Sequence, residues 1–210
     1  MKPIYEAVAE KYTPAKIGNA GSFFKNPVIS SENAEKLLAG WPTAPHYPQA
    51  DGSVRIVHRM GDVGWFDAQG RLWANEMGPK GGDELNLIVE GRNYGWPEVS
   101  NGSHYGGADI ADHAAGDGFE APKVWWNPSI SPGSLMIYSG AQFPQWQGDA
   151  FIGALSGEAL IRVDLDGTAA TKGDQWGFGA RIRAVDQAPD GSIWLLTDGS
   201  DGRLLRLTPA

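Results

Sequence analysis

Residues 181–209 read RIRAVDQAPDGSIWLLTDGSDGRLLRLTP. Short apolar runs, IRAV, IWLL and LLRL, are separated here by segments rich in Asp, Gly and Pro. The runs are too short for helices and rich in the branched and aromatic residues that strands favour. The separators carry the residues that build tight turns. This stretch therefore predicts a meander of antiparallel strands.

The same alternation extends back to about residue 58, through runs such as LWAN, LNLIV, VWW, LMIY, AFIGAL and LIRVDL. One type of hairpin recurs, because residues 66–73 (FDAQGRLW) can be aligned with residues 187–194 (QAPDGSIW). Each has a Gly-containing turn followed by an aliphatic residue and Trp, and residues 163–167 (VDLDG) offer a third, weaker turn. Recurrence of one hairpin type favours propeller blades over a sandwich.

Residues 1–57 have a different pattern. Apolar residues recur at helical spacing in residues 3–11, and again in residues 31–40, where Ser31 is a candidate N-cap and Gly40 can end the helix. Between them, GNAGSFFKNPVIS predicts a loop that enters a short strand. We therefore expect a small α+β segment over residues 1–57 and a mainly β region over residues 58–210.

Charge restricts the kinds of partner. The net charge of −8 argues against nucleic acid or an anionic membrane as a partner. Residues 58–210 hold eleven Lys or Arg and twenty Asp or Glu, so the acidity belongs to the β region. That excess fits either a solvated acidic surface or a site for calcium. The absence of Cys excludes disulfides and thiolate chemistry.

The beginning of the chain has no apolar core of a secretory signal, and no run reaches the length of a membrane span. The chain as given is therefore expected in the cytoplasm if it is expressed in this form.

The segment with the most closely spaced candidate metal-binding groups is residues 75–86, NEMGPKGGDELN. Three Gly and a Pro allow close approach to the backbone, and two carboxylates follow at once. Hard cations such as Ca²⁺ take several oxygens from carbonyls and carboxylates together. The alternating ligands of an EF-hand are missing, so the residues alone leave a structural turn as the favoured alternative to a metal site.

Residues 76–97, EMGPKGGDELNLIVEGRNYGWP, resemble a hallmark of the soluble aldose (glucose/sorbosone-type) dehydrogenases that use pyrroloquinoline quinone (PQQ). The resemblance continues to the end of the chain and covers about 150 residues. It implies a six-bladed propeller with PQQ over the central channel, of which about three blades would be present here.

The resemblance implies two calcium sites. Gly78 and Pro79 match the pair whose backbone carbonyls hold the calcium that clamps PQQ. Glu84, through its carboxylate, and Tyr94, through its carbonyl, match ligands of a second, structural calcium.

The resemblance also implies contacts to PQQ. Arg181 and Arg183 match two arginines that contact the cofactor, and residues i and i+2 of a strand point to one face, so both cations can meet one planar anion. Without the resemblance, the same pair fits two arginines on an exposed strand face. Arg59 matches a further PQQ-contacting arginine, and Ser129 matches a hydroxyl residue at the edge of the cofactor.

Several positions depart from the family pattern. Met60 replaces the usual Asn, Ser156 stands where the family has a lysine near the quinone, and the segment that carries the family's catalytic histidine has no counterpart. His58 matches a scaffold histidine, and its use as a base is not favoured. His113 and the neighbouring His104 lie in a Gly-, Ala- and Asp-rich loop and are expected to be exposed.

Residues 18–27, GNAGSFFKNP, resemble a different family, UDP-N-acetylenolpyruvoylglucosamine reductase, an FAD enzyme of peptidoglycan synthesis. The similarity covers about 50 residues. Ser22 matches the serine that protonates the enol intermediate in that family. The flavin-binding domains have no counterpart here, so we favour a purely structural role for Ser22.

Three functional hypotheses follow. The leading one is a quinoprotein oxidoreductase that oxidises the C1 hydroxyl of aldose sugars and passes electrons to an external acceptor. The resemblance implies a periplasmic location for the family, although this chain as given is expected in the cytoplasm. The alternatives are a fragment of the FAD/NADPH-dependent reductase and a calcium-binding β module without catalysis.

Overall fold

A computed structural model of the protein describes residues 28–29, 35, 46–48, 54–56 and 63–209. The chain divides into two compact units, Met1–Met60 and Gly61–Ala210. In the first unit β1 (Val28–Ile29), β3 (Val54–Ile56) and β2 (His46–Pro48) form an antiparallel sheet with β3 in the centre. Of the two expected helices, residues 3–11 lie outside the described residues, and residues 31–40 are described only at Glu35, which is helical.

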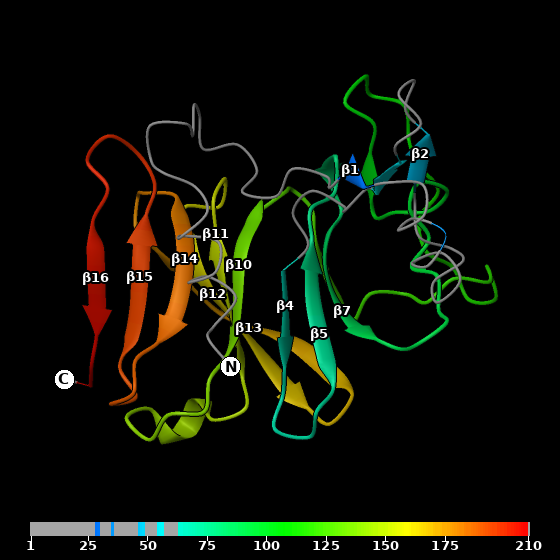
Figure 1. Ribbon diagram of the computed structural model, residues 1–210. Helices are drawn as coiled ribbons and strands as arrows, with labels where there is room; N and C mark the ends of the chain where they lie inside the picture. Colours follow the sequence, from blue (N-terminus) through cyan, green and yellow to red (C-terminus); the bar gives the residue numbers. More distant parts are fainter. Residues whose placement is uncertain (1–27, 30–34, 36–45, 49–53, 57–62, 210) are drawn as a thin grey trace. The chain divides into compact units, whose positions relative to one another are not determined.

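The second unit contains three larger antiparallel sheets, each formed by strands that follow one another along the chain (Figure 1). The first sheet has the order β4 (Val63–Phe66), β5 (Leu72–Glu76), β7 (Asp83–Ile88) and β9 (Val124–Trp126). The second has the order β10 (Pro132–Ile137), β11 (Ala150–Ala154), β12 (Ala159–Asp166) and β13 (Ala169–Gly177). The third has the order β14 (Ile182–Gln187), β15 (Ile193–Thr197) and β16 (Leu204–Leu207).

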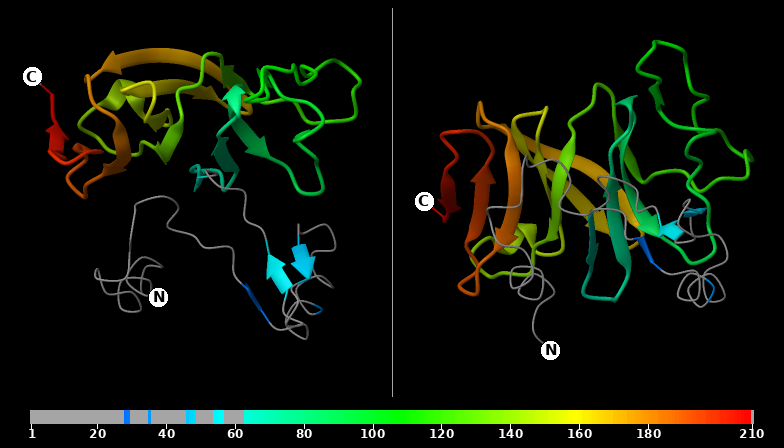
Figure 2. Two further views of the ribbon diagram at one scale, coloured as in Figure 1. Left: turned by 90° about the horizontal axis from the view of Figure 1, so that it is seen from above. Right: turned by 45° about the horizontal axis from the view of Figure 1, so that its top comes forward.

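Viewed from above, the three sheets follow one another around an arc (Figure 2). The mainly β fold predicted from the sequence is confirmed, and the three successive sheets correspond to the expected blades. Among the described residues, no helix combines the length and the apolar composition that crossing a bilayer requires.

Strands β10 and β11 of the middle sheet are buried on both faces, which explains their apolar runs, whereas the outer strand β13 is mostly exposed. Successive side chains of a strand point to opposite faces. Leu135 and Ile152 therefore pack with residues of the first sheet, whereas their neighbours Met136 and Phe151 pack with residues of the third. All four side chains are at most 2% exposed.

The repeated hairpin noted in the sequence has the same backbone geometry at both places. In the first sheet the Asp67 N–H donates to the Arg71 carbonyl, and the Gly70 N–H donates to the Asp67 carbonyl. In the third sheet Ala188, Ser192 and Gly191 form the same pair of bonds at the aligned positions. The two central glycines have φ angles of 76° and 84°, which glycine adopts without strain. The turn at residues 163–167 is different, because it is a tight hairpin that pairs Asp166 with Ala169.

A long excursion connects β7 to β9 and spans residues 89–123. Its short strand β8 (Gly102–Ser103) pairs with β6 (Lys80–Gly81), which lies in the Gly-rich segment between β5 and β7. A second connection, between β10 and β11, contains the 3-10 helix η2 (Pro144–Trp146). The excursion therefore brings a distant part of the chain next to the segment that holds the predicted metal ligands.

Candidate functional site

The Gly-rich segment between β5 and β7 is folded so tightly that its backbone contacts itself. A Cβ atom on Gly78 would collide with the carbonyl oxygen of Gly81 and would lie 2.6 Å from the carbonyl group of Gly82. Gly81 and Gly82 have φ angles of 78° and 72°, in the region that favours glycine. A side chain at Gly102 of β8 would in turn collide with Gly81. Glycine is required at positions 78 and 102 because the backbone of Gly81 and Gly82 lies too close to leave room for a Cβ atom.

Asp83 fixes this segment to the following part of the chain. Its side chain is fully buried. One carboxylate oxygen accepts the Gly78 N–H at 2.8 Å, and the other accepts the N–H groups of Ile130 and Ser131 at 2.6 and 2.7 Å. A buried carboxylate is stable only when it is hydrogen-bonded in this way. Asp83 therefore sets the position of Gly78, one of the predicted calcium residues.

Ser129 takes part in the same network. Its hydroxyl accepts the Gly81 N–H at 3.0 Å and lies 3.3 Å from a carboxylate oxygen of Asp83. Ser156, which stands in place of the family lysine, donates its hydroxyl to the Ser129 carbonyl at 3.0 Å. The family resemblance placed Ser129 at the edge of a cofactor. In the structure its hydroxyl binds the backbone of the Gly-rich segment, and its carbonyl accepts the hydrogen bond from Ser156.

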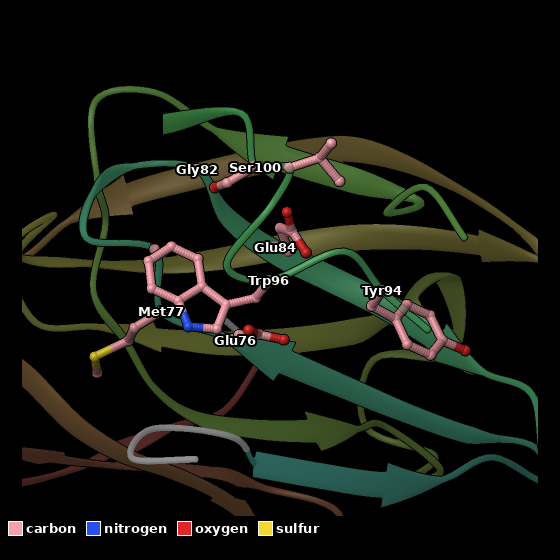
Figure 3. Close-up of a pocket in the computed structure, with 9 residues that line it drawn as sticks. Glu76, Met77, Gly82, Glu84, Tyr94, Trp96 and Ser100 are labelled. Atoms are coloured by element: carbon pink, nitrogen blue, oxygen red, sulfur yellow. The ribbon is translucent and has the colours of Figure 1, made fainter. Parts of the chain in front are cut away.

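A small cavity of about 10 Å³ lies beside the Gly-rich segment. Figure 3 shows the side chains around it. The residues that line it are Glu76, Met77, Gly78, Gly82, Glu84, Tyr94, Trp96, Val99 and Ser100. A volume of this size suits one small particle, such as a water molecule or a single ion. Three of the four predicted calcium residues, Gly78, Glu84 and Tyr94, therefore line one cavity, whereas Pro79 is half-buried and does not line it.

Glu76 and Glu84 face each other across β5 and β7, where they are directly paired. Like charges that lie opposite one another in a sheet are unfavourable by themselves and favourable around a cation. Glu84 is only 5% exposed, and its second oxygen accepts a hydrogen bond from the Asn86 amide at 3.2 Å. Two acidic side chains therefore line the cavity on the side of the sheet. The role of Glu76 was not predicted from the sequence.

Tyr94 uses its hydroxyl for the backbone rather than for the cavity. The hydroxyl donates to the Leu87 carbonyl at 2.8 Å and accepts the Val89 N–H at 2.7 Å. Burial raises the pKa of this phenol. The side chain thus anchors the start of the excursion, and Tyr94 is one of the residues that line the cavity.

Among the described residues, no group of three or more His, Asp or Glu side chains is arranged around a common metal position. The predicted calcium sites do not require one, because hard cations also accept backbone carbonyls as ligands. Asn86 Oδ1 is a buried acceptor without a hydrogen-bond partner on the same strand as Glu84. Asn86 does not line the cavity, so only the pair of opposed carboxylates there fits a bound cation.

The expectation that His113 is exposed was wrong. Its side chain is only 6% exposed and lies between two carboxylates, whereas His104 is exposed as expected. A side chain at Gly95 would lie 3.2 Å from the ring, so the imidazole occupies space that this glycine leaves free. The Gly-, Ala- and Asp-rich composition of the loop predicted that His113 is exposed. Composition alone does not show how the ring packs beside Gly95.

Arg181 and Arg183 both bind Asp198. Arg183 lies 2.5 Å and Arg181 3.3 Å from the same carboxylate oxygen. The Arg183 hydrogen bond is the main cause that lowers the pKa of Asp198. The two arginines therefore share one anion, but this anion is Asp198 and not the cofactor that the family resemblance named. With Asp198 they leave a net charge of +1 at the start of β14.

Arg59, Ser22, His58 and Met60 lie outside the described residues.

The fold agrees with what the chain is similar to. The family model of glucose/sorbosone dehydrogenases matches residues 56–206. The chain belongs to this family. The similarity therefore covers all three sheets of the second unit.

Three individual relatives show how much of this chain and how much of each relative is similar. The aldose sugar dehydrogenase YliI of Escherichia coli K12 is 41% identical over 161 residues, which are 74% of this chain and 42% of that protein. The solved apo-form of the soluble E. coli aldose sugar dehydrogenase matches with a TM-score of 0.65 at 37% identity, over 70% of this chain and 44% of that one. The PQQ-bound form of an aldose sugar dehydrogenase from Streptomyces coelicolor matches with a TM-score of 0.55 at 31% identity, over 80% and 48%. The chain thus spans less than half the length of these relatives.

Another set of relatives has a different activity. UDP-N-acetylenolpyruvoylglucosamine reductase of E. coli K12 is 52% identical over 65 residues, which are 31% of this chain and 18% of that enzyme. The corresponding enzyme of E. coli O6:H1 is 48% identical over 80 residues. The predicted resemblance to this reductase is therefore confirmed, and it is longer than the expected 50 residues.

Three functional residues were missed in the sequence. Asp83, Glu76 and Asp198 are acidic residues that organise the site. Their positions in the sequence could have indicated a role in the site. Asp83 and Glu76 lie within the motif at residues 75–86, and Asp198 follows an expected strand. The sequence alone did not show which carboxylates are buried.

Proposed function

We propose that this chain provides the calcium- and PQQ-binding half of a quinoprotein that oxidises the C1 hydroxyl of aldose sugars. The observation that supports the proposal most is the cavity beside the Gly-rich segment. It is lined by Glu84 and Tyr94, which the family resemblance connects with the structural calcium, and by Gly78, which the resemblance connects with the other calcium. The opposed carboxylates of Glu76 and Glu84 give this cavity the charge that a divalent cation requires.

In this proposal the chain's residues bind and orient. Gly78 and Pro79 offer backbone carbonyls to the calcium that holds PQQ, and Asp83 keeps the Gly78 backbone in place. Glu84 and the Tyr94 carbonyl hold the second, structural calcium.

Arg181 and Arg183 meet the anionic cofactor, and Asp198 holds both guanidinium groups in one orientation. Ser129 supports the Gly-rich segment, and Arg59 is a further proposed contact to PQQ. When bound, PQQ supplies the acceptor for the hydride of the sugar C1, and an external acceptor then receives the electrons.

The general base is proposed to come from outside the matched region, since the chain spans less than half of its relatives. We further propose that residues 1–57 and 58–210 derive from two different enzymes, with the dehydrogenase part of periplasmic origin. Cell fractionation of the expressed protein tests that location.

A binding titration tests the proposal. PQQ is expected to quench the tryptophan fluorescence of the chain in the presence of CaCl₂ and much less in EDTA. Replacement of Arg181 and Arg183 by Ala is expected to weaken PQQ binding at least about tenfold, because a hydrogen bond to a charged group is worth about 1.5–3 kcal/mol. Arg203→Ala, which changes an exposed arginine immediately before β16, is the matched control.

Calcium-independent PQQ binding that is unaffected by the arginine variants would contradict the proposal. In dye-linked assays with an aldose, Ca²⁺ and PQQ, the isolated chain is expected to show weak turnover or none, because the proposed base lies elsewhere. Robust turnover would show that the chain contains its own base.

A second candidate function rests on the reductase relatives of the chain. It predicts bound FAD and a role for Ser22 as proton donor. The absorption spectrum of the purified protein separates the two, because bound flavin has a characteristic visible band. A third outcome, stabilisation by calcium without any effect of PQQ, would favour a β module without catalysis.

A further inference from the structure

His113 is a buried ionisable side chain that the proposed function leaves without a role. It lies on the excursion between β7 and β9, and 6% of its side chain is exposed. Neither ring nitrogen has a hydrogen-bond partner. A buried polar atom without a partner is costly, so such an arrangement requires an explanation.

The ring lies between two carboxylates. Its Nε2 atom is 3.8 Å from Oε1 of Glu84, and its Nδ1 atom is 3.7 Å from Oδ2 of Asp117. Both distances are too long for a hydrogen bond and too short for a water molecule between the atoms. A shift of less than 1 Å toward Glu84 would therefore form a direct hydrogen bond.

Asp117 is itself held firmly. Its carboxylate accepts the N–H groups of Ala114 and Phe119 at 2.9 and 2.8 Å, and these bonds, led by Ala114, lower its pKa. On the other side, the second oxygen of Glu84 already accepts the Asn86 amide. The excursion therefore presents His113 to the one oxygen of Glu84 that Asn86 does not hold.

We propose that His113 is a positioning residue for Glu84, and that its Nε2–H donates to Oε1 of Glu84 when calcium occupies the cavity. The inference rests on the proposed function, because Glu84 is the carboxylate assigned there to the structural calcium. Carboxylate ligands of metals are commonly oriented by a hydrogen bond from a second residue, and loss of such a partner lowers metal affinity about 10- to 100-fold. The excursion would thereby contribute to calcium affinity without providing a ligand through this histidine.

Calcium titration without PQQ tests the inference. His113→Leu removes the donor at similar volume and is expected to weaken Ca²⁺ binding about 10-fold or more, measured by calorimetry. His113→Gln places an amide N–H near the position of Nε2 and is expected to retain affinity within about threefold. His104→Leu, on the same excursion, is the matched control. A role in packing alone would not separate the Leu and Gln variants in affinity.

A double-mutant cycle keeps the test decisive if His113→Leu folds poorly. His113→Asn, whose shorter side chain does not bring its amide to the position of Nε2, is expected to weaken Ca²⁺ binding in the wild type. In a Glu84→Gln background the same exchange is expected to have no further effect on Ca²⁺ affinity, because the oriented carboxylate is gone. Equal affinity of the wild type and His113→Leu would overturn the inference alone. Absence of any Ca²⁺ binding by the wild type would overturn the proposed calcium site, and the inference with it.

Discussion

Gly78 shows how a single missing side chain can define a site. The Gly78→Ala variant is expected to lose calcium-dependent PQQ binding, because the added methyl group would collide with the backbone of Gly81 and Gly82. Overpacking of this kind costs about 1–3 kcal/mol, which urea unfolding measures. Gly106→Ala is the control, since a Cβ there meets no atom within 4 Å. Equal PQQ binding by both variants would contradict this account.

Asp83 is the residue on which the position of the Gly-rich segment depends. Asp83→Asn exchanges one buried oxygen for an N–H₂ group that faces backbone N–H donors. The free energy of unfolding is expected to fall by about 2–3 kcal/mol, the usual cost of losing a charged hydrogen bond. Chemical denaturation measures this, with exposed Asp112→Asn as control. A change below about 0.5 kcal/mol would show that the network has other support.

At the scale of elements, the third sheet carries a pH-dependent link between its turn and its last strand. Asp190 accepts hydrogen bonds from the Ser192 hydroxyl and backbone N–H and binds Arg206, and these contacts lower its pKa from 3.8 to about 2. A carboxyl group whose pKa is depressed by folding stabilises the protein above its unfolded pKa. That contribution is lost as the pH falls through the folded value.

The corresponding experiment compares melting temperatures of the wild type and Asp190→Asn between pH 2 and pH 6. The wild type is expected to be more stable above about pH 4, and the difference should shrink to nearly zero by about pH 2. A difference that does not change with pH would mean that the charge of Asp190 is not responsible.

The strands could be predicted from the sequence better than the site. Apolar runs between turns predict the strands. A strand that is buried on one face alternates apolar and polar residues, and a strand that is buried on both faces is continuously apolar. Strand periodicity also predicted that Arg181 and Arg183 can reach one shared anion, for which PQQ was named, but it did not predict their shared partner Asp198. The burial of His113 could not be predicted, because it depends on Gly95 and on carboxylates that are distant in the sequence.

At the scale of the whole molecule, calcium is expected to act as a stabilising ligand. Saturating Ca²⁺ at about 100 times the dissociation constant adds about 2.7 kcal/mol to the stability of the folded state. For a unit of this size the melting temperature is then expected to rise by several degrees, and EDTA should reverse the change. Differential scanning calorimetry measures this effect.

The Glu84→Gln variant serves as the control for that measurement, because it removes the charge of the proposed ligand. It is expected to lose most of the calcium-dependent shift. An unchanged shift would mean that the stabilising calcium binds somewhere else.

The two copies of the repeated hairpin place their tryptophans in different environments, so these tryptophans should differ in how their fluorescence is quenched. Trp73 and Trp194 occupy aligned positions, but Trp73 is fully buried against the second sheet, whereas Trp194 is half-buried beside Arg206 and the exposed Leu196 and Leu204. Iodide should therefore quench the fluorescence of Trp194 and spare that of Trp73, and the difference between wild type and Trp194→Phe isolates this signal. Trp194 thus serves as a built-in optical reporter of any polypeptide that covers the open face of the third sheet.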